Sequence, residues 1–345
     1  MSTNLDQHLD GSSRPAAGAL DEAFAPLRRE LLAHCYRMLG SFHDAEDAVQ
    51  ETYLRAWRSY SSFEGRSSVR TWLHRIATNV CLTMCEARKS RALPRGLGQE
   101  RSDPRALLEQ SHEIPWLEPF PGPTAGTSAD PATATTEHAR VRLALIAALQ
   151  HLPARQRAAL LMKEVLQWKA SEIADALGTT TTSVNSSMQR ARAHLAELAL
   201  DEDTLAEPDD QATRELIGRY ASALERKDIP AIVQMFTADA IWEMPPFVGW
   251  YQGPADIGAL IDIQCPAGPG ELSALPVIMN AQPALAVYIA APGDRWEAFQ
   301  IQVLDHDGQG RLAHAYVFFD TALFTAAGLP LALPGTEMQR RLRRA

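Results

Sequence analysis

Side chains that can read the edges of DNA bases are gathered along one side of residues 183–192. Val184, Met188 and Ala191 recur at the spacing of an inward helix face. The opposite side carries hydroxyl, amide and guanidinium groups: Ser183, Asn185, Ser186, Gln189, Arg190 and Arg192. Amide and guanidinium groups form paired hydrogen bonds with base edges, and Arg and Ser also bind phosphates. We interpret this segment as a DNA-reading helix; a plain helical hairpin with a solvated polar face is the alternative.

A second unusual surface lies in the stretch "DAEDAVQETYLRAW" at 44–57. Its small and apolar residues form one helix face: Ala45, Ala48, Val49, Thr52, Tyr53 and Ala56. The other face carries almost only negative charge and one leucine: Asp44, Asp47, Gln50, Glu51 and Leu54. A solvated helix face usually mixes both signs in i,i+4 pairs. A face of one sign can steer a basic partner, and an exposed leucine can add apolar burial at its centre.

A polar loop followed by a helix occupies "SYSSFEGRSSVRTWLHRIATNVCLTM" at 59–84. Phe63 and Arg66 in the loop can hold an unstacked base by stacking and hydrogen bonding. Along one side of the helix lie side chains suited to a single-strand backbone: Arg70, His74, Arg75 and Asn79. Trp72 and Ile76 are interpreted as core residues rather than as platforms for bases.

Acid and base side chains also occur in the last third of the chain: Glu243, His314, Tyr316 and Asp320. An enzyme would need a positioned carboxylate base and a donor that stabilises an oxyanion. Strand alternation places His314, Tyr316, Phe318 and Asp320 on one face, and Trp296, Gln300 and Gln302 on a face of the neighbouring strand. Such a group fits a catalytic cleft, a ligand-sensing cleft or a satisfied core. The spacing alone identifies no specific base.

The four cysteines indicate neither a metal site nor disulfides. Cys35, Cys81, Cys85 and Cys265 form no C-x-x-C pair and have no zinc-like His spacing. They are interpreted as reduced, buried thiols of a cytoplasmic protein. No apolar stretch is long enough to span a membrane, and the polar N-terminus lacks a signal core. We therefore expect no membrane contact and no cofactor.

The DNA-reading segment needs a helix-turn-helix to position it. In "WKASEIADALGTTTTSV" a short helix ends at Gly178, where a left-handed cap suits glycine. Four threonines turn the chain, and a second helix starts near Ser183 with a Thr or Ser cap. The second helix of such a pair enters the major groove. The preceding "LPARQRAALLMKEV" begins a helix at Pro153, adds Arg155 and Arg157 beside the hairpin, and packs on it.

Charge is divided unevenly among the modules. Residues 24–92 carry 11 Lys and Arg against 7 Asp and Glu, which gives +4, and residues 137–200 carry 8 against 5, which gives +3. Residues 201–345 carry 10 against 20, which gives −10. Two mildly basic modules before an acidic one indicate nucleic-acid contact by the first two only.

Composition divides the chain into seven segments. Residues 93–136 contain seven prolines and no sustained period, and residues 201–211 are acidic. Past residue 211 two helices precede strand-like runs such as "ALAVYIAA" and "WEAFQIQVLDHD", a pattern of an antiparallel α+β domain. We expect a disordered leader at 1–23, helical modules at 24–92 and 137–200, a linker at 93–136, an acidic hinge at 201–211, an α+β domain at 212–335 and a basic tail at 336–345.

The two helical modules together resemble the sigma-70 family in its extracytoplasmic-function (ECF) class. The acidic helix "DAEDAVQETYLRAW" precedes "LPARQRAALLMKEVLQWKASEIADALG" in the order of that family, over residues 24–92 and 137–200. The resemblance implies that 24–92 is sigma region 2 and 137–200 is sigma region 4. It also implies that the acidic face docks on the beta-prime clamp helices of RNA polymerase core. Residues 59–79 would then recognise and open the −10 promoter element, and 183–192 would read the −35 element.

The last domain resembles the SnoaL-like branch of the nuclear transport factor 2-like fold, a cone of curved sheet closed by helices. The resemblance rests on "ELIGRYASALERKDIPAIVQMFTADAIWEMPP" and "GWYQGPADIGALI". The linker wording "EIPWLEPFPG" resembles that of sigma factors with such an appendage. Free linkers seldom carry aromatic residues, so Trp116 and Phe120 are expected to latch onto the last domain or the first module.

We therefore expect a sigma factor that directs RNA polymerase to promoter DNA and is modulated in cis by its last domain. That domain would bind a partner protein or a small-molecule ligand. One rival is a SnoaL-like isomerase, cyclase or ligand sensor fused to a helix-turn-helix module, because some relatives of the fold are enzymes. A conventional repressor is a second rival, but it needs neither the acidic helix nor the −10-like loop.

Overall fold

The computed structural model describes residues 14–87, 90–122, 142–197 and 211–342. They form two compact units, each described here by itself. The first unit comprises the chain up to Leu39, His43–Lys89 and Leu152–Ala191; the second comprises Gly40–Phe42, Ser90–His151 and the chain from Arg192 onward. The polypeptide therefore leaves the first unit three times and returns to it twice.

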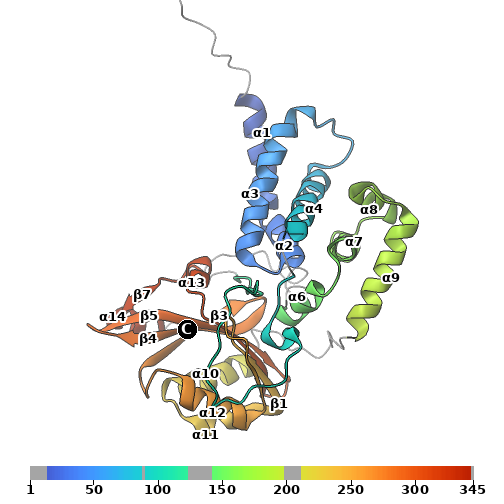
Figure 1. The fold of residues 1–345 in the computed structure, drawn as a ribbon. Coiled ribbons are helices and arrows are strands. Elements are labelled where there is room, and N and C mark those ends of the chain that lie inside the picture. Colours follow the sequence, from blue (N-terminus) through green and yellow to red (C-terminus); the bar gives the residue numbers. More distant parts are fainter. Residues whose placement is uncertain (1–13, 88–89, 123–141, 198–210, 343–345) are drawn as a thin grey trace, which may run out of the picture. The chain divides into compact units, whose positions relative to one another are not determined.

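The first unit is helical (Figure 1). It contains α1 (Arg14–Phe24), η1 (Ala25–Leu27), α2 (Arg28–Leu39), α3 (Phe42–Ser59), η2 (Tyr60–Ser62), α4 (Val69–Ala87), α7 (Ala154–Glu164), α8 (Ala170–Leu177) and most of α9 (Thr181–Glu197). Apolar residues at three- and four-residue spacing form its core, as α2 shows with Leu31, Cys35 and Met38. The predicted inward stripe of α3 is buried at Ala45, Ala48, Val49, Thr52 and Ala56.

The expected disordered leader differs from the structure over residues 14–23. These residues belong to α1, in which Leu20 and Phe24 are buried. The two side chains are four residues apart and so share one helix face. The Phe24 ring packs edge-on against Tyr53 with centroids 5.1 Å apart, and the Tyr53 hydroxyl donates to Asp21 Oδ1 over 2.6 Å. Residues 1–13 lie outside the described residues.

Helix α7 packs on α2 and α4 within the first unit. Arg157 was expected to add basic charge beside the helix-turn-helix, but it is buried. Its guanidinium donates to the carbonyl oxygens of Met38 at the end of α2 and of Leu152, the latter over 3.1 Å. Helix C-termini leave carbonyl groups without intrahelical donors, which explains why a buried arginine is stable there.

The second unit is built on one sheet. Its strands are β1 (Phe236–Glu243), β2 (Trp250–Gln252), β3 (Leu272–Met279), β4 (Gln282–Ala291), β5 (Arg295–His306), β6 (Leu312–Phe318) and β7 (Ala332–Pro334). The order is β2-β1-β6-β5-β4-β3, with β7 on β5. The strand-like runs read from the sequence are confirmed, but not their purely antiparallel pairing. Strand β1 runs parallel to β6, because these strands are distant in the chain rather than joined by a hairpin.

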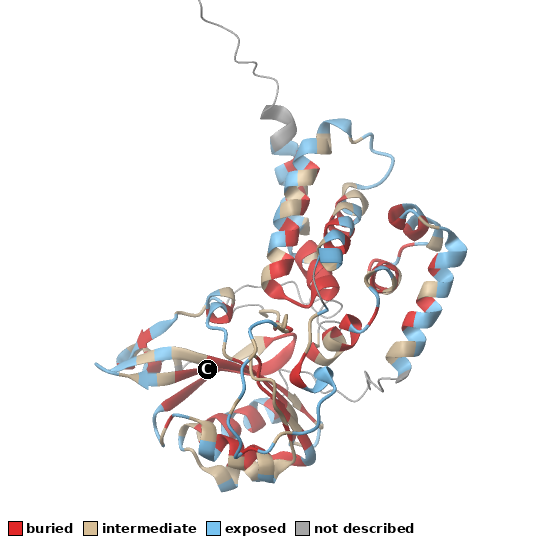
Figure 2. Cartoon of the chain, viewed as in Figure 1, coloured by how far each residue is buried: buried red, intermediate tan, exposed pale blue. Residues whose placement is uncertain are grey.

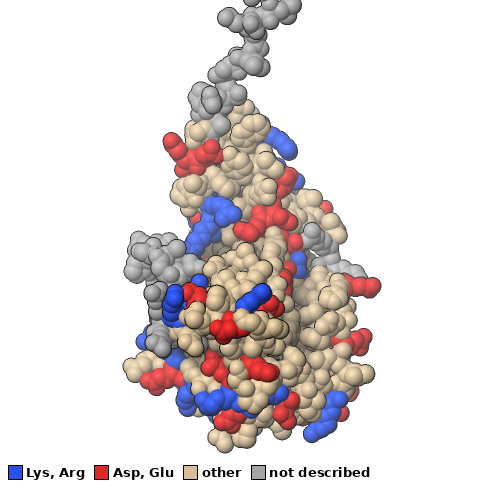
Figure 3. Space-filling view, turned by 90° about the vertical axis from the view of Figure 1, so that its left-hand side faces the viewer, with Lys and Arg blue, Asp and Glu red and all other residues tan. Residues whose placement is uncertain are grey.

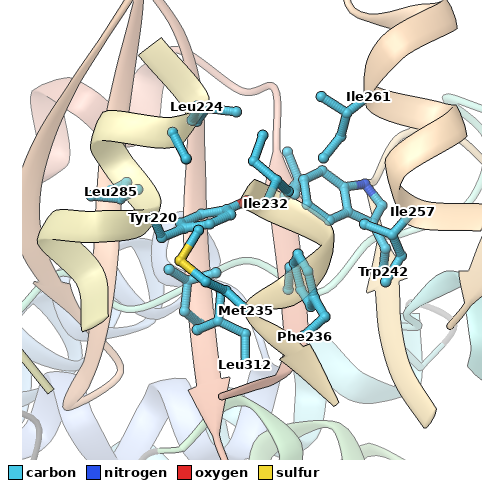
Figure 4. Packing of buried hydrophobic residues seen from close by; sticks show 14 of the residues in the cluster. Tyr220, Leu224, Ile232, Met235, Phe236, Trp242, Ile257, Ile261, Leu285 and Leu312 are labelled. Atoms are coloured by element: carbon cyan, nitrogen blue, oxygen red, sulfur yellow. The ribbon is translucent and has the colours of Figure 1, made fainter. Parts of the chain in front are cut away.

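Helices cover one face of this sheet and form the main core with it. They are α10 (Gln211–Glu225), α11 (Ile229–Gln234) and α12 (Pro254–Gln264). Figure 4 shows Tyr220, Ile232 and Ile257, one from each helix, packed with Trp242 and Leu312 of the sheet. The central parts of the strands are buried (Figure 2). The domain is thus α+β, as its element order predicts.

The opposite sheet face binds the start of α6 (Leu143–Gln150). The Leu143 amide donates to Gln282 Oε1 over 2.7 Å, and the Arg142 guanidinium lies 3.6 Å from the Asp305 carboxylate. Strand pairing puts Asp305 beside His314 of β6. The beginning of the second helical module is therefore attached to the C-terminal sheet within the second unit.

Residues 90–122, which we call the connecting segment, also lie against this domain. They were expected to be part of a linker, yet they form backbone hydrogen bonds with it. Val248 N donates to Glu109 O and Ser111 N donates to Pro246 O, each over 2.9 Å. The segment includes the short turn η3 (Pro94–Leu97). Residues 123–141 of the expected linker and most of the acidic hinge lie outside the described residues.

The chain ends in ordered elements over most of the expected basic tail. Helix α13 (Ala322–Ala326) and β7 precede α14 (Gly335–Leu342), in which Met338 is buried. Glu337 of α14 pairs with Arg340 and Arg341, so part of the basic charge is neutralised locally. Residues 336–342 of the expected tail therefore belong to a helix packed on β5 and β7.

Candidate nucleic-acid and partner interfaces

The helix-turn-helix forms at α8 and α9. Gly178 ends α8 with a φ of 61°, the left-handed conformation that the sequence predicts. Thr180 caps the start of α9, because its Oγ1 accepts from the Ser183 amide over 3.2 Å. Ile173, Leu177 and Val184 are buried between the two helices and α7. These contacts fix the direction in which α9 presents its outer side.

The outer side of α9 carries the six predicted DNA-reading residues. Their side chains are all exposed: Ser183, Asn185, Ser186, Gln189, Arg190 and Arg192. Arg190 donates to Ser186 Oγ over 2.6 Å and lies 3.4 Å from Ser187 Oγ. Hydroxyl groups in the preceding turn thus hold its guanidinium along the helix. We call these six residues the α9 face.

The predicted acidic face of α3 is exposed only in part. Asp47, Gln50 and Leu54 are exposed and Glu51 is half-buried, whereas Asp44 is buried. The expectation that Asp44 faces solvent is wrong, because it lies four residues before Ala48 and therefore on the buried stripe. Trp57 was missed: it is 53% exposed, three residues after Leu54, which is 38% exposed. Its helical spacing from Leu54 was a signal in the sequence.

Ion pairs reduce the excess of negative charge on α3. Glu51 pairs with Arg55 over 2.7 Å, and Glu46 pairs with Arg28 over 3.5 Å. Figure 3 accordingly shows acidic and basic side chains interspersed on the face that it presents. We call Asp47, Gln50, Glu51, Leu54 and Trp57 the α3 face.

The loop before α4 holds its aromatic residues against one another. Phe63 and Trp72 have ring centroids 4.9 Å apart, and Tyr60 stacks on Phe63 at 6.3 Å. Trp72 is half-buried in this cluster rather than fully in the core. Arg66 is exposed and donates to Glu64 over 2.6 Å. To stack on a base, Phe63 would exchange its contact with Trp72 for the base.

Helix α4 presents three of its four predicted backbone-tracking residues. Arg70, Arg75 and Asn79 are exposed, and Arg70 donates to Glu30 Oε2 over 3.0 Å. His74 is buried, so its assignment to that side is wrong.

His74 is buried because it lies three and four residues before the buried Ala77 and Thr78, on the face of α4 that packs on α2. Its ring lies 5.4 Å from that of His34, and its Nδ1 bonds to the Arg70 carbonyl oxygen over 2.9 Å. Burial holds the pKa of both His34 and His74 below the ordinary value.

The two expected latch residues have different contacts. The Trp116 indole donates to Ser111 O over 2.7 Å, within the connecting segment. Phe120 is tied to Asn280, at the turn between β3 and β4: its amide donates to Asn280 Oδ1 over 2.6 Å and its carbonyl accepts from Asn280 N over 2.7 Å. Its ring lies edge-on to Phe42 in the same unit, at 5.8 Å.

Gly122 extends this docking to strand β3. Its amide donates to Ile278 O over 3.0 Å, and a Cβ at this position would lie 2.5 Å from the same oxygen. Only glycine allows the connecting segment to approach the strand so closely.

The acid and base residues of the C-terminal domain do not form one cleft. Glu243 is buried and accepts from Arg95 N over 2.7 Å, with its other oxygen 2.8 Å from His314 Nε2. Tyr316 donates to Asp305, and burial raises the pKa of Tyr316 well above its ordinary value. The group lies on the sheet face that binds α6. Asp320 instead caps α13 through the Ala322 amide.

A cavity of about 310 Å³ opens on the other face of the sheet. Gln300 and Gln302 line it, but among the described residues its wall holds no Asp, Glu, His, Lys or Arg. Trp296 lies away from it, paired with Leu333 of β7. The candidate bases and the cavity are therefore on opposite faces.

Comparison with known proteins assigns the family. Residues 23–91 match the family model Sigma-70 region 2, and residues 142–195 match Sigma-70, region 4. The ECF RNA polymerase sigma factor SigG of Mycobacterium tuberculosis is 53% identical over 310 residues, which cover 89% of this chain and 83% of that protein. The chain belongs to the ECF sigma factor family.

Other relatives share this sigma factor's architecture. The ECF sigma factor SigJ of Mycobacterium tuberculosis is 28% identical over 237 residues, 67% of this chain and 68% of that protein. The crystal structure of SigJ matches with a TM-score of 0.59 at 21% identity, over 90% of this chain and 99% of that one. The sigma factor thus combines two sigma-70 modules with a C-terminal α+β domain.

Two further observations complete the description of this sigma factor. Among the described residues, no cluster of His, Cys, Asp or Glu is arranged to hold a metal ion. In the same part of the chain, no helix is both long and apolar enough to cross a membrane.

Proposed function

We propose that this sigma factor binds RNA polymerase core and directs it to promoters in the cytoplasm. The α3 face would dock on the beta-prime clamp helices. The loop at 60–68, with Arg70, Arg75 and Asn79 of α4, would hold the opened −10 strand, and the α9 face would read the −35 element. The observation that carries this proposal is that all six side chains of the α9 face are exposed, in a chain whose α3 face is also largely exposed.

The test is run-off transcription with core polymerase. Full-length protein should support initiation at a cognate promoter, and a variant with Asp47→Lys and Glu51→Lys should not. If the parent binds the promoter tightly without polymerase and supports no run-off product, the conventional repressor is the better description.

We also propose that the sigma factor has no chemistry of its own. Glu243 bonds to His314 and to the Arg95 amide of the connecting segment, on the face away from the cavity. A base must reach the proton it removes, and these groups are engaged elsewhere. Turnover of any candidate ligand by the purified protein would contradict this proposal.

The C-terminal domain is proposed to modulate initiation in cis. It binds both described ends of the connection between the sigma modules: the connecting segment at Phe120 and the start of α6 at Leu143. Docking would limit how far regions 2 and 4 can separate on polymerase. Docking that holds the modules closed should make undocked variants more active, and docking that orders the connection productively should make them less active.

Full-length variants test this first, and a truncation that removes the domain tests it independently. Gly122→Val should prevent the close approach to Ile278 O and change run-off transcription several-fold. Trp116→Ala and removal of 206–345 should shift activity in the same direction. Gly96→Val is the matched control, because a Cβ there meets nothing within 4 Å. If both glycine variants transcribe like the parent, modulation through the connecting segment is refuted.

A further inference from the structure

The cavity of the C-terminal domain has aromatic and aliphatic walls. Phe319 packs edge-on against Phe247 and Phe299, with ring centroids 5.3 and 5.4 Å apart. Leu260 of α12 and Leu224 of α10 complete the side formed by helices. A volume of about 310 Å³ is at the lower end of the range of small-molecule pockets.

Two buried N–H donors belong to side chains that line this cavity. The Trp242 indole Nε1 and the Gln302 Nε2 have no hydrogen-bond partner among the described residues. Gln302 Oε1 accepts from the Tyr220 hydroxyl over 2.9 Å, so its amide nitrogen is the group left over. Buried donors without acceptors are costly. A ligand oxygen that accepts from either donor would remove that cost after a small shift of the side chain.

We propose that the cavity binds a neutral, largely apolar molecule of about two aromatic rings that carries one or two acceptor oxygens. Aromatic walls favour a planar apolar body. The lack of charged side chains in the described lining disfavours an ionised ligand, because its charge would be desolvated without a partner. Among the described residues no carboxylate, histidine, lysine or arginine lines the cavity, so we expect the ligand to be bound and not converted.

The connecting segment forms part of the cavity wall through Leu108 and Gln110. Gln264 also lines the cavity, and its Nε2 donates to Pro104 O and Ala106 O over 3.0 Å each. The ligand would therefore touch both the segment and the side chain that holds it. Occupancy should stabilise the docked segment; the step from there to transcription rests on the proposed function.

Two matched probes test the cavity on the full-length protein. N-phenyl-1-naphthylamine is neutral and apolar, and 8-anilino-1-naphthalenesulfonate has the same rings with an added sulfonate. Fluorescence titration should show saturable binding of the neutral probe to one site, at least tenfold tighter than the sulfonate. Equal affinities, or no saturable binding of the neutral probe, would overturn the proposal.

Substitutions on α12 locate the bound probe. Leu260→Trp fills the cavity and should abolish binding, whereas Ile263→Trp adds the same side chain at an exposed position of the same helix and should not. Circular dichroism checks that both variants fold. Loss of binding in the Ile263 variant alone would place the probe on the surface and refute the site.

Alkylation of the unmodified chain gives a second measurement that does not depend on a variant. Cys265 and Cys85 are both half-buried, but only Cys265 lines the cavity. The neutral probe should slow the reaction of iodoacetamide with Cys265 several-fold and leave Cys85 unchanged. Equal rates at Cys265 with and without saturating probe would contradict occupancy of the cavity.

Limited trypsin digestion tests the link to the connecting segment. Arg101 and Arg105 are exposed in that segment, and Arg66 is exposed in the loop of the first unit. Probe binding should slow cleavage after Arg101 and Arg105 several-fold but not cleavage after Arg66. Unchanged cleavage at all three would refute the coupling. These measurements contain no polymerase, so their failure leaves the proposed function untouched, and failure of transcription leaves them untouched.

Discussion

The α9 face and the sheet face that binds α6 use similar polar side chains in opposite ways. On α9 the amide, guanidinium and hydroxyl groups are exposed. On the sheet, Gln282 and Glu243 are buried and bond to backbone amides of α6 and the connecting segment. The type of a residue therefore does not reveal whether it binds a partner or its own chain. Burial distinguishes the two cases. Substitution of a buried group should lower the free energy of unfolding, whereas substitution of an exposed group should weaken binding to a partner.

The largest effect of a substitution on stability is expected at Glu243, which gives the most direct test of the difference between buried and exposed groups. Glu243→Ala leaves His314 and the Arg95 amide without their acceptor, and should lower the free energy of unfolding by about 2 to 4 kcal/mol. Chemical denaturation measures this. Glu297→Ala, which removes an exposed pair with Arg295, should cost less than about 0.5 kcal/mol. Similar losses in both variants would show that Glu243 is not a satisfied structural group.

The next effect concerns an outward set. Asp47→Lys with Glu51→Lys should leave stability nearly unchanged and weaken binding to core polymerase by on the order of 10- to 100-fold, because charge complementarity is reversed. Glu297→Lys on the C-terminal domain is the control. Pull-down and fluorescence anisotropy measure the affinity. Unchanged core binding by the double variant would refute the assignment of the α3 face.

DNA reading gives a related test on α9. Arg190→Ala should weaken −35 recognition by about 1 to 3 kcal/mol if the guanidinium contacts a base edge, without loss of stability. Gln189→Ala tests the adjacent position in the same way. A phosphate contact would instead weaken binding to all sequences and reduce its salt dependence. Promoter binding that is insensitive to both substitutions would mean that α9 is not the reading helix.

The smallest expected effect is the pH dependence of stability that comes from the buried His34 of the first unit. Burial lowers the pKa of His34 in the folded state, so the unfolded chain binds more protons below its ordinary value near 6.5. The contribution to stability is complete above about pH 6.5 and is lost as pH falls. From pH 6.5 to 5.5 the loss that comes from His34 should be about 1 kcal/mol, and the buried His74 adds to the slope in the same direction. His34→Gln should flatten this slope in denaturation at several pH values, whereas His112→Gln, at an exposed position, should not.

Local periodicity predicted the helices, the helix-turn-helix and most strands, because their spacing is visible within a few residues. The same periodicity should have excluded Asp44, four residues before Ala48, and His74, three residues before Ala77. Both residues were instead assigned to an exposed face because of their charge and because of the resemblance to sigma factors. The burial of Leu20 and Phe24 in α1 could also have been predicted from their spacing of four residues.

Long-range pairing was not predictable from one sequence. Phe120 and Asn280 are 160 residues apart, and no local pattern indicates that one amide satisfies the other. The same holds for Leu143 and Gln282, which are 139 residues apart. The cavity depends on side chains from helices, strands and the connecting segment together. Strand alternation did separate Gln302 from its neighbours Ile301 and Val303, but it did not show which face is hollow.

The distance along the chain between Phe120 and Asn280 has a consequence for synthesis. A ribosome adds roughly 5 to 20 residues per second. Phe120 is therefore made roughly 8 to 32 s before the asparagine that receives it, 160 residues later. The first sigma module is already translated when this interval begins and the second is completed within it, while the sheet that anchors their connection does not yet exist. In each new molecule the connecting segment is therefore synthesised before the sheet that binds it. Its docking on that sheet is one of the last steps of folding.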